Sequence, residues 1–213
     1  MNSRFHSLLA ALVVAVSVPA MAASPSSRAD KAAEGMLKLD ETLKEGQGQL
    51  DAATNSLNAL TGAQGSDLVK KYKEFSKQVA KTESMGKTVR SKSKDAASKR
   101  EQYLKAWEQD QGKIQNEQLK AAAEARRQEL LPTIDQVKTS LASAGESFGP
   151  FMQNLKDLDL FLGNDLSQAG LTAAADLIGK CNGSAAKVKT DLDQASEGMR
   201  ALHARITPGG AQK

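Results

Sequence analysis

Few side chains in this sequence belong to the types that catalyse reactions or hold metal ions. The chain has two histidines and one cysteine, and His6 lies in an N-terminal segment that we expect to be removed. This leaves His203 and Cys181. A di-iron helical bundle needs a Glu-x-x-His pair on each of two helices, but Arg200 stands three residues before His203. The Cys-x-x-Cys-His motif of haem attachment is missing from the sequence as well. We therefore expect no metal site and no cofactor.

The remaining polar side chains also favour structural roles. Cys181 falls on an apolar stripe, so we expect a buried thiol that behaves as a small hydrophobic group, with an intermolecular crosslink or a reactive site as the alternative. His203 lies near a predicted helix C-terminus, where a solvated cation is favoured. Asp157 and Asp159 stand two residues apart and point to different faces of a helix, which prevents paired acid and base chemistry. The sequence predicts no enzymatic activity.

Residues 1–22 have the pattern of a cleaved secretory signal. Arg4 precedes an apolar run from Leu8 to Val18, and the small-residue pattern Ala20-Met21-Ala22 follows, so cleavage is expected near Ala22. The run is about half of the roughly 20 residues that a membrane-spanning helix needs, which makes an uncleaved anchor the weaker alternative. No cysteine at the cleavage site could carry a lipid, and no later run is long enough to span a bilayer. These features predict a periplasmic protein.

The composition and the spacing of apolar residues predict an all-α fold. Aromatic residues make up only 4% of the chain and proline occurs five times, while good helix formers dominate. Apolar residues recur at alternating steps of three and four, which is the seam of helices that pack around one another. Four such stripes are present: Met36 to Leu60, Leu68 to Ile114, Leu130 to Leu162 and Leu171 to Ile206. We predict a helical domain over residues 29–206, with 207–213 as a disordered tail.

The boundary between the second and third helices has two interpretations. The stripe changes phase between Ile114 and Leu130, so one turn must lie in this interval. We place the turn at Gln115-Asn116 and expect Pro132 to kink a continuous third helix. The alternative is a break at Pro132, because the residue before a proline resists the helical conformation.

Short connections make neighbouring helices antiparallel, which predicts an elongated up-down-up-down four-helix bundle. Residues that face each other then have numbers with a constant sum about each turn. This register sets Thr82 and Gly86 level with Phe148 and Ala144, so a ring from the third helix fills the space left by small residues in the second. A closed bundle of this kind is expected to have no obvious cavity.

The same register predicts that the bundle is half-covered at one end. The first helix would start at residue 29 and the fourth would end at residue 206, which leaves 103–127 as a projecting two-helix hairpin, about 12 residues or 18 Å long. Aromatic side chains are good interface anchors. We therefore select four residues of the hairpin as candidate partner-binding residues: Tyr103, Leu104, Trp107 and Ile114. The alternative is that Trp107 packs across the two-helix seam.

Charge is distributed unevenly along the chain. Residues 67–105 contain twelve Lys or Arg against five acidic residues, whereas 133–176 contain two Lys against six acidic residues. A solvated surface is the simplest explanation, and part of the imbalance can be internal pairing. The remaining positive face could attract anionic lipid, an envelope polymer or an acidic protein. Export disfavours nucleic acid as a partner.

Several segments resemble a family of exported bacterial helical proteins classed as a domain of unknown function. The resemblance rests on Asp67-Leu68 through Lys71-Tyr72, on Leu104-Lys105-Ala106-Trp107-Glu108, on Pro150-Phe151 and on Phe161 to Leu166, and it spans roughly Asp40 to Met199. Members of that family often carry a lipoprotein cysteine at the cleavage site, which this chain lacks. The resemblance implies no activity and no functional residues.

Together these features predict a non-enzymatic structural or interaction protein of the cell envelope, whose partners are envelope proteins and which could form a homo-oligomer. Two alternatives remain. One is a periplasmic holdase that grips unfolded proteins between helical arms, and the other is a protein that binds an anionic membrane or polymer surface through its basic second helix.

Overall fold

The computed structural model describes residues 25–207 and confirms the all-α fold. The predicted signal peptide and residues 208–213 of the predicted tail lie outside the described residues. Within 25–207 there is no strand, and five helices follow one another: α1 (Pro25–Thr61), α2 (Gly65–Gln111), α3 (Glu117–Gln128), α4 (Leu131–Asn164) and α5 (Gln168–Ile206).

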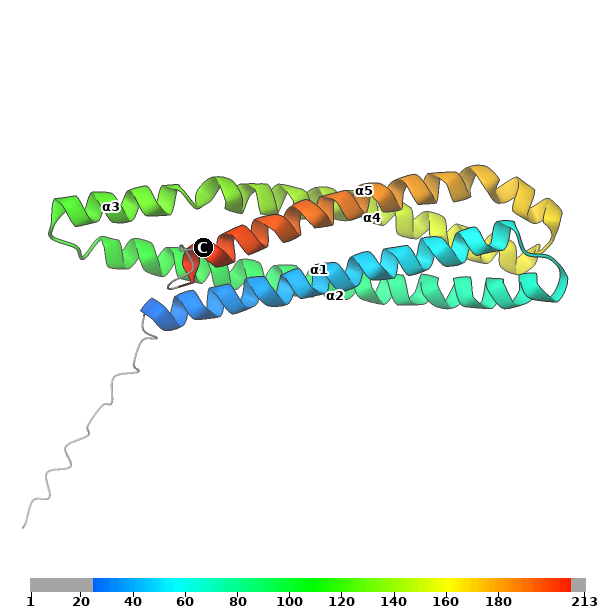
Figure 1. The fold of residues 1–213 in the computed structure, drawn as a ribbon, viewed down its shortest axis with the longest axis horizontal. Coiled ribbons are helices and arrows are strands. Elements are labelled where there is room, and N and C mark those ends of the chain that lie inside the picture. Colours follow the sequence, from blue (N-terminus) through cyan, green and yellow to red (C-terminus); the bar gives the residue numbers. More distant parts are fainter. Residues whose placement is uncertain (1–24, 208–213) are drawn as a thin grey trace, which may run out of the picture.

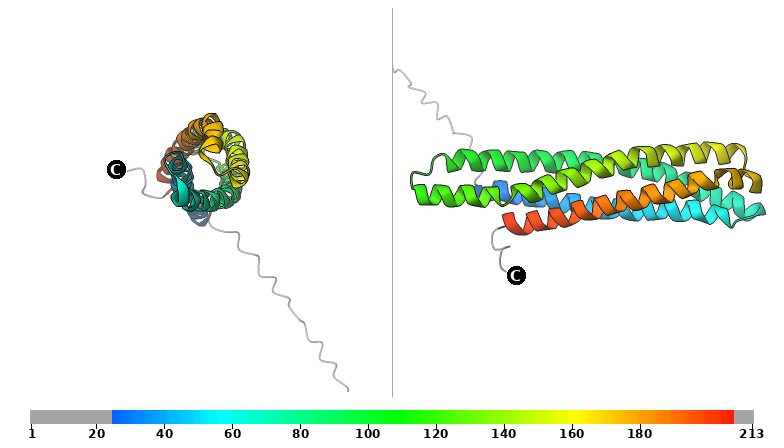
Figure 2. Two further views of the ribbon diagram at one scale, coloured as in Figure 1. Left: turned by 90° about the vertical axis from the view of Figure 1, so that its right-hand side faces the viewer. Right: turned by 90° about the horizontal axis from the view of Figure 1, so that it is seen from above.

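The helices form an elongated antiparallel bundle of four columns (Figure 1). α3 and α4 lie nearly end to end and together make the third column, while Figure 2 shows the four columns arranged around a common long axis. α1 packs against α2 and α5, and α4 packs against α5, whereas α2 and α4 contact each other least among these neighbouring pairs. The α2–α4 side is therefore the most open side of the bundle.

The predicted stripes form the core. The residues with the largest fully buried side chains come from all four columns, and almost all of them are leucine or phenylalanine. Burial of an apolar side chain of this size stabilises the fold by about 1.5–3 kcal/mol. The residues at these positions include Leu39, Leu43, Leu57, Phe75, Val137, Phe151, Leu155, Leu158 and Leu202.

The predicted turn between the second and third helices is confirmed. α2 ends at Gln111, Ile114 lies in the connection, and Asn116 caps α3 by accepting a hydrogen bond from the Leu119 backbone N–H at 3.0 Å. An asparagine at this position satisfies one of the free N–H groups of the first helical turn. Gly65, which starts α2, has a φ of 54°, a value that glycine adopts without strain.

The prediction that the third helix continues through a kink at Pro132 is wrong. The helix ends at Gln128 and α4 starts at Leu131, so the chain turns at 115–116 and also breaks just before the proline. Pro132 lies in the first turn of α4, where a missing N–H costs no hydrogen bond. Leu130 instead donates its N–H to the Arg127 carbonyl at 3.1 Å and buries its side chain.

The predicted register holds between α4 and α5, whereas between α2 and α4 it differs by one turn at Phe148. A Cβ atom on Gly86 would lie 2.5 Å from Cε1 of Phe148, so this glycine provides the space that the ring occupies. The ring lies one turn away from the predicted level, opposite Gly86 instead of Thr82. Between α4 and α5, the Arg205 side chain donates to the Glu129 carbonyl at 2.9 Å, as expected from the sum of residue numbers about that turn.

The predicted burial of Cys181 is confirmed. The thiol is free and fully buried on α5, and burial raises its pKa to about 11. Because the thiolate is the reactive form, we expect Cys181 to resist a thiol reagent such as dithionitrobenzoate at pH 8 while the protein is folded. The reagent should react within seconds after unfolding in guanidinium chloride. Rapid stoichiometric labelling of the folded protein would contradict this prediction.

Candidate functional site

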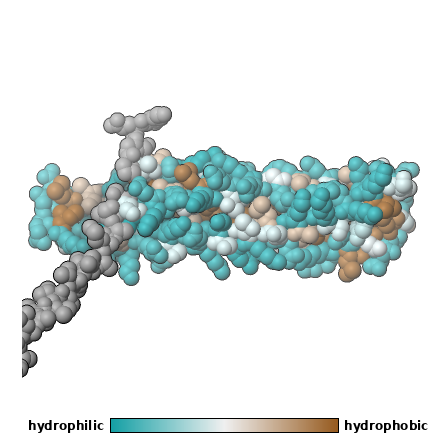
Figure 3. Space-filling model, turned by 90° about the horizontal axis from the view of Figure 1, so that it is seen from below, coloured by the Kyte–Doolittle hydropathy of each residue, from teal (hydrophilic) through white to brown (hydrophobic). Residues whose placement is uncertain are grey.

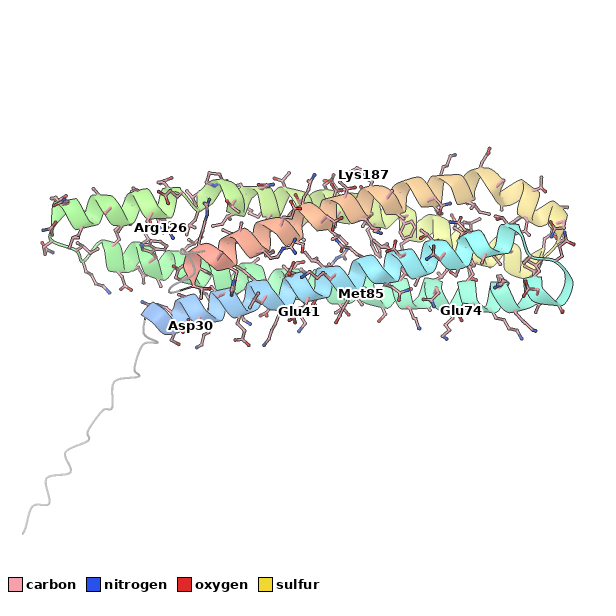
Figure 4. The ribbon with its side chains drawn as sticks, in the orientation of Figure 1. Asp30, Glu41, Glu74, Met85, Arg126 and Lys187 are labelled. Atoms are coloured by element: carbon pink, nitrogen blue, oxygen red, sulfur yellow. The ribbon has the colours of Figure 1, made fainter. Side chains whose placement is uncertain are left out.

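The end of the rod beyond α1 and α5 is a two-helix hairpin, as predicted (Figure 1). We call the last turn of α2, the connection 112–116 and α3 the hairpin end. No residue of α3 is buried, and among the described residues α3 packs only against α2 and α4. One hydrogen bond ties this region to α5, from the Arg126 side chain to the Arg205 carbonyl at 2.9 Å (Figure 4).

Three of the four candidate partner-binding residues lie at the foot of the hairpin instead of on its bare part. Tyr103, Leu104 and Trp107 are half-buried and pack against the core. The predicted starting point of the projection, near residue 103, is therefore wrong. The reason is that α1 begins at Pro25 and extends far enough for Arg28 to form an ion pair with Asp110.

Trp107 has a well-defined environment at this foot. Its ring packs against that of Tyr103, with ring centroids 5.6 Å apart and ring planes tilted by 58°. Tilted aromatic pairs of this kind are worth about 0.5–1.5 kcal/mol beyond the area that they bury. Because Tyr103 and Trp107 lie on the same helix, this ring contact does not show the alternative, packing across the seam; the packing of Trp107 against the buried core agrees with that alternative.

The bare part of the hairpin carries two further apolar side chains. Ile114, the fourth candidate, is half-buried in the connection, and Leu119 on α3 is 61% exposed. Figure 3 shows hydrophobic surface at this end of the rod. Leu119 lies on the predicted hairpin but is not one of the four candidates selected from it, and it belongs to neither apolar stripe. The sequence signal for Leu119 is that it is an apolar residue outside both stripes, in a segment where only two helices are predicted.

A polar cluster joins the two helices of the hairpin. Glu124 accepts two hydrogen bonds from Arg127, at 3.0 and 2.9 Å, and one from Gln111 of α2 at 3.1 Å. Together with a bond from Gln128, these bonds lower the pKa of Glu124 to about 2, with Arg127 as the main cause. Gln111, which also donates to the Lys120 carbonyl at 3.3 Å, joins α2 to α3, and the bonds from Arg127 favour the ionised form of the Glu124 carboxylate that it contacts.

The lowered pKa predicts acid-induced loosening of the hairpin end. A carboxylate whose pKa is lower in the folded state stabilises that state above its unfolded pKa, and the effect is lost as the pH falls. For Glu124 this window lies between the ordinary glutamate pKa of 4.5 and about 2. We expect the helical chemical shifts of α3, followed by NMR, to decline across this window and to be reduced in the Glu124→Gln variant already at pH 7. An α3 that keeps the same shifts in both cases would contradict the prediction.

A second feature lies in the middle of the rod, where the prediction of a closed bundle without a cavity is wrong. We call it the central cavity; it has a volume of about 310 Å³ and is bounded by α1, α2, α4 and α5. Met85, labelled in Figure 4, is one of its lining residues. The others are Gly46, Gln49, Leu50, Thr82, Gly86, Val89, Arg90, Ser93, Lys94, Ala97, Leu141, Ala144, Gly145, Phe148, Val188 and Leu192.

The cavity exists because several of the residues that face it along its length are small. Gly86, Ser93 and Ala97 face it from α2, and Ala144 and Gly145 face it from α4. Phe148 fills the space over Gly86, but no comparable side chain fills the space towards Ala97. The small residues of the second stripe thus serve two purposes, since they admit one ring and leave room beside it.

The fold defines the class of this protein as an antiparallel four-helix bundle with a projecting hairpin. The chain belongs to the family of proteins of unknown function described as DUF2959, whose model matches residues 28–204. This confirms the resemblance to a domain of unknown function. No curated protein and no solved structure matches the chain.

Within residues 25–207, no helix combines the length and hydropathy needed to cross a membrane, and no three potential His, Cys, Asp or Glu ligands converge on a metal position.

Proposed function

We propose that this chain is a non-enzymatic interaction protein of the cell envelope, which contacts an envelope protein through the hairpin end. The observation that carries the proposal is that α3 has no buried residue while it exposes Leu119. The opposite end of the rod also exposes apolar side chains, those of Leu160 and Phe161. The hairpin end differs because only two helices are present there, so one side of each is open to a partner.

The electrostatics of the chain support a role without catalysis. A general acid or base works best with a pKa near the working pH. Burial alone would raise the pKa of Asp40, but hydrogen bonds from Lys44, at 2.6 Å, and from Ser196 outweigh it and hold this pKa below its usual value. The Cys181 thiol has a raised pKa and is enclosed. Neither group is suited to proton transfer or nucleophilic attack at neutral pH.

Placement in the envelope rests on the N-terminal sequence, with its basic residue, apolar run and small residues before position 23. Mass determination of the protein isolated from a periplasmic extract tests this part of the proposal. A mature chain that begins near Ala23 is expected, and an intact chain recovered from the cytoplasm would contradict it.

Partner binding at the hairpin end can be tested by affinity purification from envelope extracts. We expect Leu119→Ser to reduce recovery of the specific partner about tenfold, because loss of a buried interface anchor costs more than about 1 kcal/mol. Leu160→Ser is the matched control at the other end and should leave recovery unchanged. Equal recovery with Leu119→Ser, Trp107→Ala and the unmodified protein would refute the proposal.

Binding to an anionic surface is a second candidate, favoured by the exposed cations of α2. Three lysines of this helix, Lys77, Lys87 and Lys99, pair with carboxylates of the same helix. Sedimentation with phosphatidylglycerol vesicles tests the candidate. Binding should weaken steeply as the salt concentration rises from about 0.05 to about 0.5 M, because salt screens the attraction between exposed charges. Salt-independent binding, or none, would exclude it. The exposed lysines of α2 that form no ion pair with a described residue are Lys70, Lys71, Lys73, Lys81, Lys92, Lys94 and Lys105.

A further inference from the structure

We propose that the central cavity binds the hydrocarbon chain of a fatty carboxylate, and that Arg90 and Lys94 hold its carboxylate at the mouth. This site lies away from the hairpin end and does not depend on the function proposed for that end.

The shape of the cavity suits one linear chain. The lining residues of α2 extend from Thr82 to Ala97, a span of about 22 Å along the helix axis. Those of α4 run from Leu141 to Phe148, and the other two helices contribute about one turn each. The cavity is therefore elongated along α2. Its volume of about 310 Å³ is at the lower end of the range for ligand sites, about 300–1,000 Å³, which favours one hydrocarbon chain over the two of a phospholipid.

The chemistry of the walls favours a hydrocarbon over a polar ligand. Most lining side chains are aliphatic or absent, and the polar groups that lie deep in the cavity are already bonded to one another. Gln49 donates to Thr82 Oγ1 at 3.1 Å and to Gln78 Oε1 at 2.9 Å, and Thr82 donates to the Gln78 carbonyl at 2.7 Å. A sugar or heterocycle would therefore lose its hydrogen bonds with water on entering, at about 1–3 kcal/mol for each buried group left unpaired.

Charge at the mouth is complementary to a carboxylate. Arg90 and Lys94 stand four residues apart on one face of α2, both are exposed, and both line the cavity. No carboxylate lines the cavity, and neither cation forms an ion pair with the described residues. Two nearby lysines that do not line the cavity are paired with carboxylates, since Lys87 pairs with Glu83 at 3.4 Å and Lys99 with Asp95 at 3.0 Å.

The open side between α2 and α4 provides an entrance. Near the α1–α2 turn these helices are tied by Tyr72 and Ser76, which both bond to Asp159, and by the ion pair between Glu83 and Lys156 at 3.0 Å. From residue 84 to residue 110, α2 makes no hydrogen bond or ion pair with the described residues of α3 or α4. A Cβ on Gly145, in the α4 wall, would meet no atom within 4 Å. A chain can therefore enter without breaking a polar contact.

Isothermal titration of the delipidated mature protein with hexadecanoate, below its critical micelle concentration, tests the proposal. We expect saturable binding of one hexadecanoate, and binding at least about tenfold weaker for hexadecanol, because a charge-assisted hydrogen bond is worth about 1.5–3 kcal/mol. Arg90→Gln/Lys94→Gln should weaken hexadecanoate binding to a similar degree. The control Lys87→Gln/Lys99→Gln removes two cations of the same helix that do not line the cavity, and should change the affinity less than about twofold.

A second measurement locates the chain without any substitution. In a protein with 13C-labelled methionine methyl groups, hexadecanoate should shift the resonance of Met85, which lines the cavity, and leave that of Met199, which is buried in another part of the core. Ser93→Leu and Ala97→Leu, each verified as folded by circular dichroism, should fill the space and weaken binding about tenfold or more.

Several results would overturn the proposal. They are absence of binding to the unmodified protein, equal affinity for hexadecanol and hexadecanoate, an unchanged Met85 resonance, or equal loss of affinity in the lysine control. Extraction of phosphatidylglycerol from vesicles into a one-to-one complex would overturn the assignment to a single-chain ligand.

Discussion

Replacing Leu158 by alanine is expected to destabilise the bundle by about 2–5 kcal/mol, because the substitution removes buried methyl groups and leaves a space that the helices cannot fully close. Leu158 is 1% exposed on α4. Two residues further along the same helix, Leu160 is 70% exposed, and Leu160→Ala should change the stability by no more than about 0.5 kcal/mol.

Urea unfolding followed by circular dichroism measures both values, provided that the slope of the transition is the same in all three proteins. The pair isolates burial, since residue type, helix and substitution are identical. Similar losses for the two variants, or a loss below about 1 kcal/mol for Leu158→Ala, would contradict the core described above.

Replacing Gly198 by alanine is expected to destabilise the bundle by about 1–3 kcal/mol, the usual cost of an added group in a packed core. Gly198 is buried on α5, and a Cβ atom there would lie 2.4 Å from Cγ2 of Val137 on α4. Val137 is itself fully buried, so its methyl group cannot move out into solvent. The helices α4 and α5 would have to separate.

Gly183 on the same helix is the matched control. It is exposed, and an added Cβ would meet no atom within 4 Å. Gly183→Ala should therefore stabilise the protein by about 0.5–1 kcal/mol, since alanine favours the helix over glycine. Thermal unfolding of the two variants should give melting temperatures on opposite sides of that of the unmodified protein. Changes of the same sign would refute the close approach of α4 and α5.

The fold was predictable because the apolar stripes carry most of the information. A step of three and four residues determines which side chains are buried, and the short turns determine that neighbours are antiparallel. The phase change before Leu130 indicated a turn, and the turn is where Asn116 could cap a helix. The extra break before Pro132 does not follow from the stripe, because Leu130 lies in the break itself and is still buried in phase with the stripe of α4.

The candidate sites were less predictable, for two physical reasons. The start of α1 depends on capping and ion pairs of individual residues, so the reach of Arg28 to Asp110 could not be read from a periodic pattern. The volume between helices depends on how closely the backbones approach. Small residues such as Gly86 and Ser93 are compatible both with a close contact and with a cavity, and the observed bundle has one of each.

The hairpin end and the central cavity are separate parts of the molecule, and a ligand in one need not affect the other. The hairpin end is a surface with two helices, held together by the Glu124 cluster. The central cavity lies between four helices and opens between α2 and α4, and its cations lie on α2. A protein with both features can be held in place by a partner at one end while it binds a small amphiphile in its middle.

Photo-crosslinking in living cells tests the role of the hairpin end most directly. A photoreactive amino acid at position 119 is compared with the same amino acid at position 160, because both leucines are largely exposed, at 61% and 70%, and lie at opposite ends of the rod. Capture of a discrete envelope protein from position 119, and not from position 160, is the predicted result. The same products from both positions, or none from position 119, would contradict the proposed contact surface.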